Sequence, residues 1–436
     1  GYGRGVMAPS SDTDLLFLRA YKASPHTESV IEYMLYALWD MGLKVGNAFR
    51  TPAECVKLAA EDVTIKTSLL DARFMCGDQA LFDEMQAKFK KDAVEGKDAE
   101  FIADKLAERD ARHARQGDAR YVVEPNIKEG KGGLRDLQTL YWIVKHIYGG
   151  QTLEDVMKGG PFTRSEYGSF IRSAKFLWTV RCHLHFVTGR AEERLSFDLQ
   201  PEIAARMGYR DRTGQLGVER FMKRYFLVAK DVGALTRIIA AKLEAEQKKK
   251  PEGFRRLLPQ KTPQALDDPG FVIDSGRVGI TSEDVMKRDP LNMLRLFIIA
   301  RRENKDIHPD ALSAITRNLR GINEQVRSTD EARALILDAV IGSKDPALIL
   351  RRMNEAGVLG KAIPEFGGIV AQTQFNMYHH YTVDEHTIRA VEAIAEMEQV
   401  NAERVPLATE IFPLIENRRA LYLAMLLHDT GKGRGD

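Results

Sequence analysis

The stretch SDTDLLFL at residues 11–18 decides how the first part of this chain folds, and the glycine-rich stretch GYGRG at residues 1–5 precedes it. The apolar run at residues 15–18 follows turn-forming residues and has the length of a buried strand. Side chains at positions i and i+2 of a strand point to the same face, so Asp12 and Asp14 should present two carboxylates together. We expect a small α/β unit around this strand.

A pair of carboxylates at this spacing is typical of a divalent-metal site. Mg²⁺ prefers oxygen ligands and usually keeps substrate phosphates in its shell, whereas two like charges without a cation repel each other. The preceding segment offers groups suited to the phosphates of a nucleotide, which are flexible glycine backbone, a guanidinium and a hydroxyl: Gly1, Gly3, Arg4 and Ser11. The structural alternative is a glycine turn followed by aspartates that only cap the backbone.

Outward from this segment, the sequence predicts a mainly helical protein with several domains. Apolar residues recur at helical spacing in residues 28–41, 136–148, 170–188, 218–246 and 290–303, and in a last helical unit from about residue 382. Further strands are expected at residues 44–50 and 120–124, and a β-hairpin at residues 270–280.

The domain boundaries follow from these elements and from a stretch of residues 248–268 that is rich in charge and proline. We expect an α/β unit at residues 1–133 and a helical domain that packs on it at 134–250. A linker with the hairpin and more helices should follow at 251–375, and the beginning of an all-α domain at 376–436.

The composition excludes several classes of protein. Basic and acidic residues number 64 and 62, so the chain lacks the basic excess of a nucleic-acid binder. No apolar run approaches the ~20 residues that a membrane-spanning helix needs. The three cysteines are widely spaced and form no CxxC pair, which favours reduced thiols and a cytoplasmic protein. We therefore predict neither a nucleic-acid nor a membrane partner, and the sequence does not predict an oligomeric state.

A second candidate metal site lies near the end of the chain. An apolar helical segment ends in His428 and Asp429, and His386 opens a helix about forty residues earlier. A buried aspartate is costly unless it is paired or bound to metal. Imidazole and carboxylate together can hold a divalent ion that activates water for phosphoester cleavage. The alternative is a core histidine beside an aspartate that caps a turn.

The chain resembles a known family in several of these segments. Residues 1–16 resemble the active-site segment of polymerase β-type nucleotidyltransferases, and more narrowly of bacterial PII uridylyltransferase/uridylyl-removing enzymes. The resemblance continues through residues 124–136, which contain the specific segment GGLRD, and through residues 190–198 to the last residues. The segment with His386, His428 and Asp429 is similar to the start of an HD-type phosphohydrolase domain.

This resemblance implies transfer of UMP from UTP to a tyrosine of a PII signal protein, with Asp12 and Asp14 holding Mg²⁺. It also implies hydrolytic removal of UMP at the HD site, where Mn²⁺ is an alternative ion. Three departures bear on activity. The strand expected before Gly1 is absent, which bears on nucleotide binding, and the fourth HD ligand would lie beyond residue 436. We therefore expect a fragment whose metal binding near His428 is weak or absent. Asn47 also stands where the family pattern has histidine.

Several alternatives stay open. Superfamily members often use a third carboxylate, for which Glu124 is our choice and Asp71 the second candidate. A protein adenylyltransferase would share the metal chemistry and differ only in its nucleotide. A regulatory or docking module without activity would retain the two aspartates as remnants.

Overall fold

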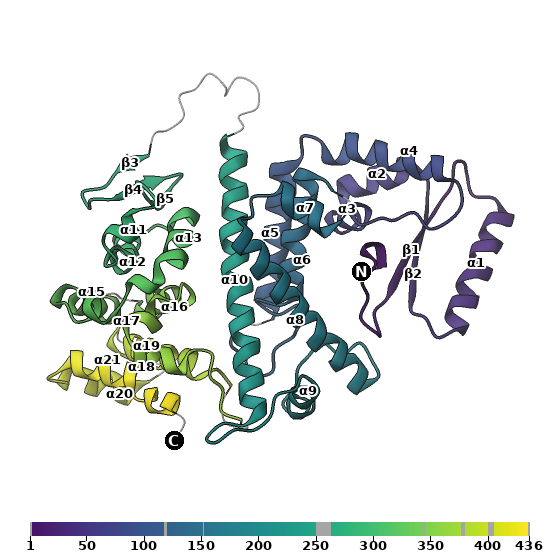
Figure 1. Cartoon of the computed structure of the whole chain (residues 1–436). Coiled ribbons are helices and arrows are strands. Elements are labelled where there is room, and N and C mark those ends of the chain that lie inside the picture. The colour runs from purple at the N-terminus through teal and green to yellow at the C-terminus, as the bar shows by residue number, and fades with distance from the viewer. Residues whose placement is uncertain are drawn as a thin grey trace. The chain divides into compact units, whose positions relative to one another are not determined.

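The computed structural model describes residues 2–116, 120–150, 152–249, 263–342, 345–375, 380–399 and 405–434 (Figure 1). The chain forms two compact units. Unit 1 comprises residues 1–118 and 126–194, and unit 2 comprises residues 119–125 and 195–436. Both are mainly helical and contain few strands, as the sequence predicts. No described helix is both long enough and apolar enough to cross a membrane.

Unit 1 contains two parallel strands and eight α-helices in its described part. The strands are β1 (Thr13–Leu18) and β2 (Val45–Arg50), and they pair with Thr13 opposite Val45. The helices are α1 (Pro25–Asp40), α2 (Pro52–Glu61), α3 (Val63–Leu70), α4 (Gln79–Phe89), α5 (Asp98–Arg115), α6 (Leu134–Tyr148), α7 (Leu153–Gly159) and α8 (Arg164–Thr188). Two short elements complete the unit, the 3-10 helix η1 (Tyr2–Arg4) and the π-helix η2 (Lys90–Val94).

Local signals explain where these elements begin. Thr51 caps α2 by accepting a hydrogen bond from the Glu54 amide, and the Glu54 carboxylate accepts one from the Thr51 amide. Pro52 follows at the first helical position, where its missing N–H costs nothing. Leu16 and Leu18 of β1 pack against a core formed by α2, α3, α4 and η2. This packing fixes which face of β1 is turned inward.

Helix α1 differs from its expected role. The sequence predicts an apolar face there, but the described unit leaves Val30, Met34 and Met41 exposed, and Leu35 is the only side chain of the helix that is buried. The periodicity therefore predicts the helix correctly and does not predict what covers it.

Unit 2 contains the remaining elements. Its strands are β3 (Gln264–Ala265), β4 (Phe271–Asp274) and β5 (Arg277–Ile280), which form an antiparallel sheet in that order. Its longer helices are α9 (Gln200–Arg206), α10 (Gly217–Lys249), α12 (Asn292–Arg302), α13 (Pro309–Asn318), α15 (Asp330–Ile341), α16 (Pro346–Glu355), α19 (Val383–Glu398) and α21 (Arg418–Leu427). Its shorter elements are α11 (Val285–Arg288), η4 (Leu319–Gly321), α14 (Glu324–Arg327), α17 (Val358–Ala362), α18 (Pro364–Ile369), α20 (Pro406–Ile411), η5 (Phe412–Leu414) and η6 (Thr430–Arg434).

One expected strand is wrong. Residues 120–124 form no strand, and within the described residues Val122 makes a single antiparallel bridge with Tyr381. The hairpin expected at residues 270–280 is confirmed as β4 and β5, and the helix expected from residue 382 is confirmed as α19.

Candidate functional site

The aspartate pair lies at the start of β1. Asp14 is the second residue of the strand, and Asp12 directly precedes it. Both aspartates are exposed and the intervening Thr13 is half-buried, as expected when alternate side chains point to opposite faces. Leu16 and Leu18 continue the same face and pack into the core. The inner end of this face is therefore fixed by packing, and its outer end carries two carboxylates in contact with solvent.

The surroundings of the pair leave its charge uncompensated. In the described part of the chain, the carboxylates of Asp12 and Asp14 accept no hydrogen bond from a backbone amide, and no cation lies within 4 Å of either carboxylate. Gly46 of β2 lies opposite Asp14 in the strand register. A Cβ atom at Gly46 would lie 2.7 Å from Asp14 Oδ1, so the glycine makes room for the carboxylate. Glycine in a strand is a known sign of close approach, and this signal was available in the sequence.

A buried histidine supports the loop before Asp12. The Ser10 amide donates a hydrogen bond to Nδ1 of His185 at 3.3 Å, which requires that Nδ1 be unprotonated. The other ring nitrogen, Nε2, lies 3.6 Å from Glu193 Oε1, and Arg181 forms an ion pair with the same carboxylate at 2.5 Å. Burial and the neighbouring Arg181 lower the pKa of His185. The imidazole is therefore neutral at pH 7, and no local pattern in the sequence points to it.

The glycine-rich segment is held against the helices of unit 1. Arg4 pairs with Asp71 at 3.2 Å, and its guanidinium lies over the ring of Trp142. Asp71 also accepts hydrogen bonds from Trp142 Nε1 at 2.8 Å and Lys145 Nζ at 3.3 Å. A Cβ atom at Gly3 would lie 1.9 Å from the Asp71 carbonyl oxygen, so only glycine allows this approach. Both Arg4 and Asp71 have partners within unit 1, and a phosphate role for Gly3 and Arg4 stays a prediction.

The other residues predicted for this site occupy different places. Gly1 lies outside the described residues. Ser11 is half-buried, and its amide donates a hydrogen bond to the Ala8 carbonyl at 3.0 Å. Glu124 belongs to unit 2, where its Oε1 accepts a hydrogen bond from the Phe197 amide at 2.8 Å. In unit 1 as described, no third His, Cys, Asp or Glu completes the aspartate pair to a compact three-ligand group.

The specific GGLRD segment organises the interior of unit 1. Asp136, in the first turn of α6, is 2% exposed and pairs with Arg112 at 2.5 Å and with His113 at 2.9 Å. It also accepts a hydrogen bond from the Gly132 amide at 2.8 Å. Burial acts to raise the pKa of Asp136, but these partners outweigh it and the pKa lies below its ordinary value. These contacts of Asp136 join α5 to α6 and to the loop before α6.

The second candidate site begins at the first turn of α19. Asp384 and Glu385 are both buried and face α16, where Asn354 Nδ2 donates to Asp384 at 2.8 Å and Arg351 Nε pairs with Glu385 at 3.1 Å. Residues one position apart on a helix point in directions about 100° apart. His386 therefore lies away from these contacts, on the side of α19 that packs against α21.

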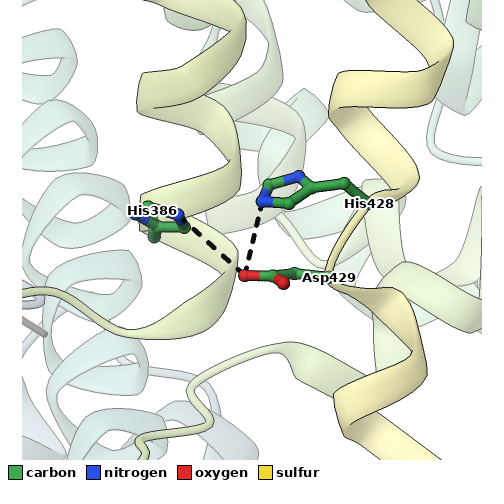
Figure 2. A group of neighbouring side chains, drawn as sticks. All are labelled: His386, His428 and Asp429. Atoms are coloured by element: carbon green, nitrogen blue, oxygen red, sulfur yellow. Dashed lines mark ion pairs between the residues drawn. The ribbon is translucent and has the colours of Figure 1, made fainter.

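Three candidate ligands converge there (Figure 2). Asp429 Oδ2 lies 3.9 Å from His386 Nε2 and 3.4 Å from His428 Nε2. His428 Nδ1 lies 2.7 Å from the Met425 carbonyl and donates to it, which leaves Nε2 as the free lone pair. Lys432 Nζ donates to the same Asp429 oxygen at 2.8 Å. Burial acts to raise the pKa of Asp429, but Lys432 and the two imidazoles outweigh burial, and the pKa lies below its ordinary value.

The donor set fits a divalent ion. One ligand atom from each of His386, His428 and Asp429 lies within 4.8 Å of the others, in the part of the chain that the structure describes. Two atoms bound at ~2.1 Å to one ion lie at most ~4.2 Å apart, so side-chain shifts of less than ~1 Å would close the cluster. Two imidazoles and a carboxylate suit Mn²⁺, Fe²⁺ or Zn²⁺ better than Mg²⁺.

Comparisons with known proteins cover most of the chain. Residues 100–240 match a family model described as GlnD PII-uridylyltransferase, and residues 271–361 match one described as uridylyltransferase GlnD third domain. A bifunctional uridylyltransferase/uridylyl-removing enzyme of Phenylobacterium zucineum is 58% identical over 437 residues, which is 99% of this chain and 46% of that protein. The enzyme of the same name from Caulobacter vibrioides is 56% identical over 440 residues, with the same coverage.

The chain spans about half the length of the curated relatives it matches. Neither family model includes the aspartate pair or the histidine cluster, whereas the relatives align over almost the whole chain. No solved structure gives a significant match.

Proposed function

The chain belongs to the family of GlnD-type PII-uridylyltransferases, and from this premise we propose that unit 1 transfers UMP from UTP to a tyrosine of a PII signal protein. The relatives carry the name uridylyltransferase/uridylyl-removing enzyme over a length about twice that of this chain. The proposal therefore concerns the full-length protein. It places the enzyme in the cytoplasm, in keeping with three cysteines that are all free thiols.

The observation that carries this proposal is the exposed, uncompensated aspartate pair at the start of β1. When bound there, Mg²⁺ supplies neutralisation of the triphosphate and polarises the phosphoryl group that is transferred. Asp12 and Asp14 would hold the ion, because their face is fixed by the packing of β1 and Gly46 leaves room for Asp14. His185 would orient the loop before Asp12 through the Ser10 amide.

The roles of the remaining residues follow from their contacts. The Ser11 hydroxyl and the backbone at Gly3 would face the triphosphate. Arg4 would first have to leave Asp71 to reach a phosphate. Glu124 accepts a hydrogen bond from the Phe197 amide within unit 2, and its role as the third carboxylate stays a prediction.

The histidine cluster favours a second activity, hydrolytic removal of UMP from the modified protein. His386, His428 and Asp429 would hold a divalent ion, Mn²⁺ rather than Mg²⁺, which when bound lowers the pKa of a coordinated water. Lys432 lies against the shared carboxylate and could meet a phosphate oxygen close to that ion. The word uridylyl-removing in the names of both relatives is consistent with this assignment.

The decisive test is labelling of a candidate PII protein by the full-length enzyme. The enzyme is incubated with Mg²⁺, the PII protein and α-labelled UTP, and in parallel with α-labelled ATP. We expect label on the PII protein from UTP only, and no label on a PII variant whose acceptor tyrosine is replaced by phenylalanine. Transfer from ATP instead would identify an adenylyltransferase. Transfer from neither nucleotide would favour a docking module without activity.

A further inference from the structure

Unit 2 contains a cavity of about 490 Å³ that neither candidate metal site uses. Its walls come from α10, α14, α17 and α18, all within unit 2. Lys223, Leu227 and Lys230 contribute from α10, where positions i, i+4 and i+7 share one face. The volume lies within the range of pockets that hold small molecules.

Four cationic side chains and no carboxylate line this cavity: Lys223, Lys230, Arg327 and Lys361. Among the described residues, none of the four forms an ion pair. Lys223 Nζ donates to the Gly368 carbonyl at 3.0 Å and Arg327 Nη1 to the Ile322 carbonyl at 3.3 Å. The cavity therefore concentrates positive charge, and no carboxylate of the described chain lies within 4 Å of these four groups.

Burial makes this charge costly. Lys230 is half-buried, and burial lowers its pKa, although the carboxylates of Asp384 and Glu355 act in the opposite direction from farther away. Burial also lowers the pKa of Lys223. Burying an ammonium group without an anion is unfavourable, so an anion bound beside Lys230 and Lys223 would be stabilised by their charge.

Glycines shape the opposite wall. Gly360 of α17 and Gly367 of α18 touch, since a Cβ atom at Gly367 would lie 2.5 Å from the Gly360 carbonyl oxygen. This contact keeps the two short helices close together. It leaves Lys361 exposed at the rim and an apolar surface, which includes Val370, beside the cations.

We propose that this cavity is a binding site for a small phosphate-bearing molecule with two or more negative charges. Phosphate groups offer several acceptor oxygens to one arginine and three lysines at once. The apolar part of the wall would take the rest of such a molecule. The site needs neither metal nor the aspartate pair and does not depend on the proposed transferase activity.

The test is calorimetry of pyrophosphate and of UMP with the chain in EDTA, so that neither metal site contributes. We expect binding with one site per chain, and unchanged binding to an Asp12→Asn/Asp14→Asn variant. Lys230→Met and Lys361→Glu should each weaken pyrophosphate binding at least about tenfold, because hydrogen bonds to charged groups contribute ~1.5–3 kcal/mol. The matched control is Lys287→Met, an exposed lysine of α11 in the same unit.

Two further readouts keep the proposal open to failure. Without ligand, Lys230→Met should melt at the same or a higher temperature than the wild type, because burial disfavours the charge that it removes. Lys361 is exposed, so its variant should fold normally. Three results would each overturn the assignment. They are the absence of binding heat, pyrophosphate binding by Lys230→Met and Lys361→Glu that is as tight as that of the wild type, and tighter binding of citrate than of pyrophosphate.

Discussion

The two candidate metal sites differ in how the negative charge of their carboxylates is compensated. The aspartate pair of unit 1 consists of neighbours in sequence, and no cation of the described chain lies within 4 Å of it. The histidine cluster of unit 2 joins two helices, and Lys432 already occupies the carboxylate oxygen that the two imidazoles face. One site thus depends on an ion from solution for compensation, whereas the other carries its own counter-charge.

This difference teaches what each site should do without metal. Removing a charge from an uncompensated pair should not cost stability. Removing the carboxylate from the compensated cluster leaves a lysine without its partner.

The largest effect is expected from Asp12→Asn and Asp14→Asn in the full-length protein. Loss of a metal ligand should cost transfer from UTP roughly 1,000-fold, or about 4 kcal/mol of transition-state stabilisation. The melting temperature in EDTA should stay the same or rise slightly. Labelled-UTP transfer and thermal melts measure the two quantities, with the exposed Asp92→Asn as control. A variant that is active but unstable would reverse the contrast drawn above.

The second prediction concerns acid, which should weaken unit 1 through His146. This side chain is buried against Phe101, and burial, aided by Lys66, lowers its pKa from 6.5 to about 4, although Asp98 lies 3.6 Å away. In the unfolded chain, the His146 imidazole therefore becomes protonated below pH 6.5. In the folded chain it becomes protonated only near pH 4. The free energy of unfolding should keep the full contribution of the neutral His146 above pH 6.5. It should fall by up to ~3 kcal/mol as the pH drops from 6.5 to about 4.

Urea unfolding of the chain at pH 7 and pH 4 in EDTA measures this loss. His146→Phe keeps the ring stack and should remove the increment, whereas the exposed His26→Phe should not. An unchanged pH dependence in His146→Phe would show that carboxylates account for all of it.

The third prediction concerns the histidine cluster in the full-length protein. His428→Ala and Asp429→Asn should each weaken Mn²⁺ binding by at least roughly 100-fold, since each removes a direct ligand. Asp429→Asn should also lower the melting temperature in EDTA, because Lys432 loses its partner. Electron paramagnetic resonance of Mn²⁺ gives the affinity, and His26→Ala serves as control. If both variants bind Mn²⁺ like the wild type, the ion sits elsewhere.

The smallest effect is expected from Gly46→Ala. The added methyl would lie 2.7 Å from Asp14 Oδ1 and must displace the carboxylate by a few tenths of an ångström. We expect roughly tenfold slower transfer, because small misplacements of catalytic groups are costly. Gly159→Ala in α7 is the matched control, because the Cβ atom added there would meet its nearest neighbour, Tyr148, at an ordinary 3.4 Å. Equal rates for the two variants would mean that Asp14 tolerates this shift.

Local patterns predicted much of the fold. The run at residues 15–18 predicted β1, the helical spacing of apolar residues at 136–148 predicted α6, and the turn at residues 270–280 predicted the hairpin of β4 and β5. Each depends on neighbours in sequence. The strand expected at residues 120–124 failed because its only described pairing is with Tyr381, far along the chain, and one bridge does not make a sheet.

In the candidate sites, too, local patterns could be read from the sequence and long-range contacts could not. The spacing of Asp12 and Asp14 could be read directly, whereas the supports of their loop and strand come from elsewhere in unit 1, at His185 and Gly46. The buried pairing of Asp136 with Arg112 was hidden because it depends on how α5 packs on α6. His386 could be grouped with His428 and Asp429 by residue type and by its place at the start of a helix, but the packing of α19 on α21 that brings the three together could not be read from the sequence.

Helix α1 has a consequence for hydrogen exchange. A helix of 16 residues with one buried side chain gains little from tertiary packing, and short helices are barely stable on their own. Its amide hydrogens should therefore exchange with deuterium well before those of α6, in which ten side chains are buried. Partial deuteration of residues 25–40 would then report local opening of this helix while the strands beside it stay intact.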